Sequence, residues 1–127
     1  MLGLPGDFTP PSRFVRSALF TTNVLPIDTA KGAVLQVFHL LNNFDIPKGS
    51  VTDQSQGKPM HDSTQWTSAN DLKNKRFHFR TYADSTIRMV DLMTFDLDAK
   101  DIKIISMQGE TLIKNVSRDA KNLSKTS

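Results

Sequence analysis

Arg13 and Arg16, in the segment SRFVR, are the side chains whose type and spacing point most directly to chemistry. They lie near the start of a predicted helix, where cations oppose the helix dipole. An arginine kept at such a position can orient a sulfur, a carboxylate or a carbonyl oxygen. The alternative interpretation is that both are solvated surface residues of the helix, so the pair alone does not define a function.

A metal centre or a nucleophilic side chain has little support in this sequence. There is no cysteine, and the three histidines, His39, His61 and His78, lie on three different predicted elements. No two of them have the i, i+4 spacing of a helical zinc site. A Gly-rich phosphate loop and a G-x-S-x-G motif are also missing. We therefore expect no metal and no cofactor, and ordinary hydrogen-bonded histidines.

Residues 75–82, KRFHFRTY, could form an RNA-binding platform, because basic side chains alternate with Phe77 and Phe79 along one predicted strand. The RNA-recognition motif, however, has a glycine after the basic residue and a βαββαβ order, and neither occurs here. The net charge is only +3, which is small for a phosphate-binding surface. We expect core phenylalanines beside an exposed basic row, and no nucleic-acid partner.

Length and composition place the chain among ordinary globular proteins. It has 127 residues, of which 38% are hydrophobic and 23% charged, and this predicts a single domain. No apolar run approaches the length of a membrane span, and the N-terminus lacks the pattern of a signal peptide. We expect no membrane partner, and the sequence leaves the localisation open.

Two helices are predicted in the first half of the chain. Ser12 is a candidate N-cap of the first; its apolar stripe is Phe14, Val15, Ala18 and Leu19, and Pro26 ends it. The second begins after Asp28 or Thr29. Its core-facing stripe is formed by Ala30, Ala33, Val34, Val37, Phe38, Leu41 and Phe44.

The second half changes to the period of β-strands. After a polar loop at 49–62, alternating patterns predict four strands, at 64–68, 77–82, 87–92 and 102–105. Short connections make the first three antiparallel neighbours. The fold class is therefore α+β, with two helices packed on an antiparallel sheet. We expect the second helix's stripe and the Phe77/Phe79 face to be buried, against each other or against a second layer.

Four segments of the sequence resemble the choloylglycine hydrolase and penicillin V acylase family. They are GLPGDFTPPSRFVRSALF (3–20), VFHLLNNFDIPKGSV (37–51), TQWTSANDLKNKRFHFRTY (64–82) and IRMVDL (87–92). The first is the most specific, because Gly-x-Pro-Gly-Asp precedes Ser-Arg-Phe at a short fixed distance. The QWT and FRTY segments look more like the penicillin acylases of Gram-negative bacteria, which are exported, than like the bile salt hydrolases.

The resemblance implies an N-terminal nucleophile hydrolase with an αββα sandwich. Such enzymes cleave the amide bond of penicillin V, conjugated bile salts or N-acyl homoserine lactones with an N-terminal Cys whose own amino group is the base. Of the family's site residues only one has a match here, Arg13, which by resemblance helps to position the thiol and the amine. The resemblance assigns no role to Arg16, which would serve as a control.

From these features we predict that the chain is the C-terminal portion of such a hydrolase. Residues 1–114 would form that portion and 115–127 a flexible tail. Because the nucleophile is missing, the chain is expected to be inactive alone, with a small acyl amide as the substrate. The expected partner is an N-terminal acylase portion or a second copy of the chain. The alternative is a non-catalytic remnant that binds small ligands or a partner.

Overall fold

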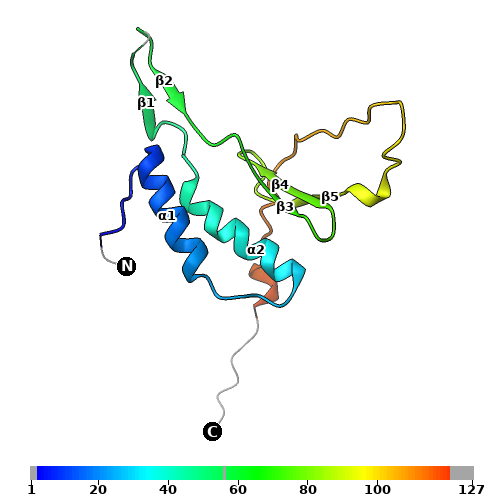
Figure 1. Cartoon of the computed structure of the whole chain (residues 1–127). Helices are drawn as coiled ribbons and strands as arrows, with labels where there is room; N and C mark the ends of the chain where they lie inside the picture. The colour runs from blue at the N-terminus through cyan, green and yellow to red at the C-terminus, as the bar shows by residue number, and fades with distance from the viewer. Residues whose placement is uncertain (1–2, 56, 121–127) are drawn as a thin grey trace.

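The structure is a computed structural model that describes residues 3–55 and 57–120. Figure 1 shows two helices at one end of the chain, followed by a small hairpin and a three-stranded sheet. The elements are α1 (Pro10–Asn23), α2 (Ala30–Leu41), η1 (Asn42–Phe44), β1 (Val51–Asp53), β2 (Met60–Asp62), β3 (Trp66–Asp71), β4 (Arg76–Thr81), β5 (Arg88–Asp91), η2 (Leu92–Thr94) and η3 (Ser117–Asp119).

Helix α1 begins two residues before the predicted cap. Its N-cap is Thr9, whose side chain makes no capping bond, and two prolines occupy the first turn. Proline suits these positions because the first amides of a helix have no partner within it. Ser12 is therefore not the cap; it lies inside the first turn.

The apolar side of α1 is exposed, so its predicted stripe has no core to face among the described residues. Phe14 is 73% exposed, and Val15 and Leu19 are also exposed. The buried side chains of the helix are instead Ser12 and Arg16. The stripe has the correct helical period, but the described residues place no apolar layer against it.

Helix α2 forms where it was predicted, but its stripe is buried only in part, because Ala30 and Val37 are exposed. Thr29 is the N-cap, and its side-chain oxygen accepts a hydrogen bond from the Gly32 amide at 3.1 Å. Phe38 is buried, with only 3% of its surface exposed. The last predicted turn is the 3-10 helix η1 rather than a continuation of the α-helix.

The three-stranded sheet has the predicted antiparallel order β3-β4-β5. Asp71 pairs with Arg76 across the first turn, and Arg76 also pairs with Asp91 on the other side. Lys75, just before β4, has a φ of 54°, an uncommon conformation for a residue with a side chain that is tolerated in turns.

Helix α2 covers the face of the sheet opposite to Phe77 and Phe79. The Arg80 guanidinium lies 5.5 Å from the centre of the Phe38 ring, and His78 and Arg76 line a cavity with α2. Side chains alternate between faces along a strand, so Phe77 and Phe79 point away from the helix. The basic row, expected to be exposed, is half-buried under α2.

The opposite face carries Phe77, Phe79 and Val90. The two phenylalanine rings stack with centres 5.7 Å apart, and Arg88 covers Phe79 with its guanidinium 4.6 Å from the ring centre. Ile105, in the irregular chain after β5, lines a cavity together with Val90. This face is therefore covered in part by an arginine and by irregular chain, not by the second helix.

Two predictions about strands are wrong. Residues 49–62, predicted as a loop, contain the hairpin of β1 and β2, in which Val51 pairs with Asp62. Its strands have only three residues each, too short to show alternation. Residues 102–105, predicted as a strand, are irregular, because no neighbouring strand of the described residues pairs with them.

The chain exposes much more surface than a folded monomer of its mass. Its accessible surface is 10950 Å², against about 6,800 Å² expected from the usual scaling of surface with mass. Among the described residues the buried apolar side chains are Phe38, Ile46 and Phe79.

Of the predicted tail, 117–119 form η3 and 121–127 lie outside the described residues. In the part that is described, no helix is long and apolar enough to cross a membrane.

Candidate active-site segment around Arg13

A short polar turn precedes α1 and holds its first residues. The Asp7 carboxylate accepts hydrogen bonds from the Thr9 amide at 2.8 Å, from the Thr9 hydroxyl at 2.5 Å and from the Ser12 hydroxyl at 2.7 Å. These bonds stabilise the charged form and lower the pKa of Asp7 from 3.8 to about 2, with the Thr9 hydroxyl as the largest cause and Ser12 next. The Gly-Asp part of the motif is thereby fixed to the helix.

Arg16, one turn further along α1, also binds this turn to the helix. Its Nη1 donates to the carbonyl oxygens of Pro5 and Asp7 at 2.8 and 2.7 Å. Only 5% of the residue is exposed. Arg16 is therefore neither a solvated surface residue nor a neutral control for Arg13. No sequence pattern indicates this burial.

Phe44 joins the two arginines to the next element. The Arg13 and Arg16 guanidinium carbons lie 6.0 and 5.4 Å from the centre of the Phe44 ring. The Phe20 ring meets the same ring edge-on at 6.4 Å between centres. A cation within about 6 Å of an aromatic face is attracted by it, so Phe44 holds both guanidinium groups beside η1.

Arg13 differs from Arg16 in exposure. The residue is exposed, and no side-chain hydrogen bond or ion pair joins its guanidinium to the described residues. Its own amide donates to the Thr9 carbonyl at 3.0 Å, which anchors its backbone in the first turn. A planar guanidinium fixed at the backbone and open at the tip can donate two parallel hydrogen bonds to a carboxylate, a carbonyl or a thiolate.

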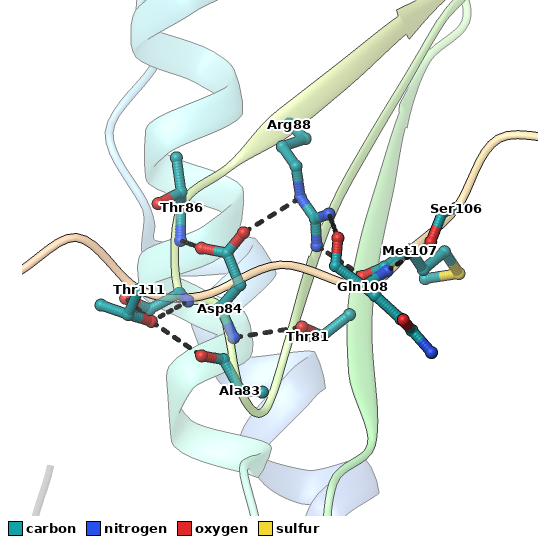
Figure 2. A network of polar contacts seen from close by, with 10 residues as sticks. Thr81, Ala83, Asp84, Thr86, Arg88, Ser106, Met107, Gln108 and Thr111 are labelled. Carbon is teal, nitrogen blue, oxygen red and sulfur yellow. Dashed lines mark hydrogen bonds and ion pairs between the residues drawn. The ribbon is translucent and has the colours of Figure 1, made fainter.

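A second polar cluster holds the chain after β5 against the β4–β5 turn (Figure 2). Arg88 donates to the carbonyl oxygens of Met107 and Gln108 at 2.9 and 3.0 Å. Arg88 also forms an ion pair with the buried Asp84 at 3.4 Å. The Thr86 amide and side chain, and after them the Arg88 charge, lower the pKa of Asp84.

Thr111 closes this cluster from the other side. Its hydroxyl oxygen accepts from the Ser85 amide at 2.8 Å, and its amide donates to the Ala83 carbonyl at 3.2 Å. Gly109 lies so close to Asp84 that a Cβ atom there would overlap the carboxylate. The hydrogen bonds of Arg88 and Thr111 in this cluster join residues 19 to 28 positions apart, and sequence patterns contain no signal for it.

The other predicted candidates do not come together. His39 and His61 are exposed and His78 is half-buried, each on its own element. Within 3–55 and 57–120, no three His, Cys, Asp or Glu side chains are grouped to hold a metal ion. In the KRFHFRTY strand, Arg76 pairs with Asp91 at 3.0 Å and Arg80 with Asp45 at 2.7 Å, on the face opposite to the phenylalanines.

The sequence matches one protein family over most of its length. The profile of the linear amide C–N hydrolases, choloylglycine hydrolase family, matches residues 1–105. The chain therefore belongs to the choloylglycine hydrolase family. The matched range includes the Asp7 turn, Arg13 and the whole three-stranded sheet.

Individual relatives agree with this assignment. A bile salt hydrolase/transferase from Clostridium perfringens is 32% identical over 117 residues, which are 92% of this chain and 35% of the relative. That of Lactiplantibacillus plantarum is 35% identical over 109 residues, 86% of this chain and 33% of the relative. An uncharacterised protein of Paramecium bursaria Chlorella virus 1 is 44% identical over 89 residues, 68% of this chain and 32% of the relative.

Solved structures show the same fold. A mutant of the conjugated bile acid hydrolase from Clostridium perfringens superposes with a TM-score of 0.71 and 31% identity, covering 91% of this chain and 34% of that one. The penicillin V acylase from Agrobacterium tumefaciens gives a TM-score of 0.65 at 24% identity, covering 77% and 30%. The α+β fold is thus part of an αββα N-terminal nucleophile hydrolase sandwich. The chain spans about a third of the length of these relatives.

Proposed function

We propose that this chain supplies the C-terminal portion of an amidohydrolase that cleaves non-peptide amide C–N bonds. The observation that carries the proposal is the family match over residues 1–105, together with an exposed Arg13 on a buried support. Penicillin V, conjugated bile salts and N-acyl homoserine lactones are the substrate classes to test. The penicillin V acylase and bile salt hydrolase names of the relatives support the first two.

Arg13 would position the reacting groups rather than react itself. The nucleophile of this chemistry is a Cys thiol at a chain N-terminus, activated by its own amino group. A guanidinium beside it can hold the thiolate and the substrate carbonyl in a reactive geometry, and errors of about 1 Å in such geometry cost on the order of a hundredfold in rate. The Asp7 turn, Arg16 and Phe44 fix the helix turn that carries Arg13.

We further propose that the chain has no hydrolase activity alone. It contains no cysteine, so in this proposal the thiol is supplied by residues outside these 127, in an N-terminal acylase portion. The competing proposal is a non-catalytic remnant that binds a small ligand or a partner, for which the same absence of cysteine is the supporting observation.

The test is hydrolysis of the three substrate classes by the 127-residue chain, alone and with a Cys-initiated N-terminal portion of a choloylglycine hydrolase. We expect turnover only in the mixture, and a loss of about a hundredfold in Arg13→Ala. Arg13→Lys should fail nearly as badly, because lysine keeps the charge but loses the planar fork.

Arg118→Ala is the matched control. Arg118 is an exposed arginine of η3 that lies outside the family-matched residues, so its removal should leave turnover unchanged. Turnover by the chain alone would contradict the requirement for an added thiol. Turnover in the mixture that ignores Arg13 would remove its positioning role, and no turnover in any mixture would favour the remnant.

A further inference from the structure

Residues 102–105, Ile-Lys-Ile-Ile, have the sequence of a β-strand but no strand partner. Ile102 and Ile104 are 90% and 89% exposed. No hydrogen bond links the amides or carbonyls of 102–105 to the rest of the described residues. β-Branched residues of this kind are enriched in strands whose side chains pack against neighbours, so the segment lacks both the ladder and the packing that its sequence favours.

The segment is held in place at its C-terminal side. Arg88 binds the carbonyl oxygens of Met107 and Gln108, and Thr111 bonds to the β4–β5 turn. Figure 2 shows the chain that carries Ser106, Met107, Gln108 and Thr111 passing beside the β4–β5 turn at these contacts. Anchoring next to a segment reduces the conformational entropy that it loses when it binds.

We propose that residues 102–105 are a docking strand that adds to a sheet edge in the remaining two-thirds of a choloylglycine hydrolase. This inference rests on the proposed function. The family match extends to residue 105, so the segment lies within the part of the chain that matches the family profile. The relatives are about three times as long as the region they share with this chain, and they therefore contain the polypeptide that would supply the edge.

Strand addition has a defined chemistry in this segment. The partner's backbone accepts from and donates to alternate residues, while side chains of one face enter its apolar layer. Ile102 and Ile104 share one face by their spacing, and Lys103 and Ile105 share the other. Ile105 already lines a cavity with Val90, so the Ile102/Ile104 face is the one left for the partner.

The experiment measures association of the full chain with the Cys-initiated N-terminal portion by calorimetry, and amide hydrogen exchange at 102–105. Successive amides of a strand point to opposite edges. Two single variants, Lys103→Pro and Ile104→Pro, therefore each remove the hydrogen-bond donor of a different edge. Ile113→Pro is the control, because Ile113 is also 89% exposed in irregular chain. Circular dichroism checks that the variants fold alike.

We expect the amides of 102–105 to become protected only in the mixture, and at least one of the Lys103→Pro and Ile104→Pro variants to bind at least tenfold more weakly. The Ile113→Pro variant should bind like the wild type. Association of the wild type without protection, and with both variants binding normally, would overturn the docking strand and leave the two-part hydrolase intact. Protection in the chain alone that rises with its concentration would assign the strand to a second copy and overturn the proposal. A wild type that does not associate would contradict the two-part hydrolase itself, and the docking strand with it.

Discussion

Arg13 and Arg16 lie one helical turn apart, and the structure gives them opposite surroundings. Arg16 is buried and bonds to two carbonyl oxygens of the preceding turn, whereas Arg13 is exposed. The Nε and Nη2 atoms of Arg16 are buried without a partner among the described residues. The sequence indicated that the pair was unusual, but not that Arg16 is the buried support and Arg13 the exposed donor. That difference arises from the contacts of Arg16 with Pro5, Asp7 and Phe44.

The Asp7 carboxyl provides a prediction at this scale. Its pKa is lowered from 3.8 to about 2 by the Thr9 and Ser12 hydroxyls. Ser12→Ala removes one donor, so the Asp7 pKa should rise towards 3.8 in a carbon-13 NMR titration of the carboxyl group. A pKa that stays near 2 in the variant would contradict the hydrogen bond.

The same shift fixes the sign of a pH effect. Since the folded-state pKa is below the unfolded one, the contribution of Asp7 to stability is complete above about pH 4 and is lost as the pH falls towards 2. The lowered pKa of Asp84, due to the Thr86 amide and side chain and then Arg88, acts in the same direction. Hydrogen exchange of the Thr9 amide should therefore accelerate, relative to the intrinsic rate of a free chain, as the pH falls through this range.

At the scale of elements, α2 and the sheet follow from the sequence much better than the rest. Thr29 as the N-cap, the helix that follows it and the antiparallel order of β3, β4 and β5 are local signals that are confirmed, whereas the apolar stripe of α2 is buried only in part. The hairpin at 51–62 and the irregular structure of 102–105 depend on pairing between segments and not on local sequence patterns. A strand forms only with a neighbour, and the periodicity of one segment does not say whether that neighbour is present.

Phe38→Ala tests the packing of α2 on the sheet. Phe38 is 3% exposed and stacks under Arg80, so its truncation should cost about 3–5 kcal/mol of unfolding free energy. Phe14→Ala is the matched control, because Phe14 is 73% exposed and its removal leaves no cavity. Equal unfolding midpoints for Phe38→Ala and the wild type in urea would contradict the assignment of Phe38 to the core.

Gly109→Ala tests the cluster around Asp84. An added Cβ atom would overlap the Asp84 carboxylate and approach Arg88, so residues 106–111 should detach from the β4–β5 turn. The expected cost is about 1–3 kcal/mol, measured as faster hydrogen exchange at the Thr111 amide. Gly6→Ala is the control, because nothing lies within 4 Å of its added Cβ atom. Unchanged protection of Thr111 would show that the cluster does not depend on this close approach.

At the scale of the whole molecule, the exposed apolar side chains predict self-association. The accessible surface of 10950 Å² includes Phe14, Trp66, Ile102 and Ile104, all more than half exposed. Large exposed apolar area of this kind favours association over a stable monomer. Light scattering should show a mass that rises with concentration, and an apolar dye should bind the chain. A monomer of constant mass that binds no dye would contradict this prediction and favour a self-sufficient domain.

The exposed stripe of α1 has a thermodynamic consequence for any polypeptide that covers it. Such a ligand binds the folded chain and not the unfolded one, so folding and binding form a single equilibrium governed by mass action. At a hundred times its dissociation constant, the ligand would add about 2.7 kcal/mol to the unfolding free energy. The melting temperature of this chain would then measure the concentration of its partner as much as its own sequence.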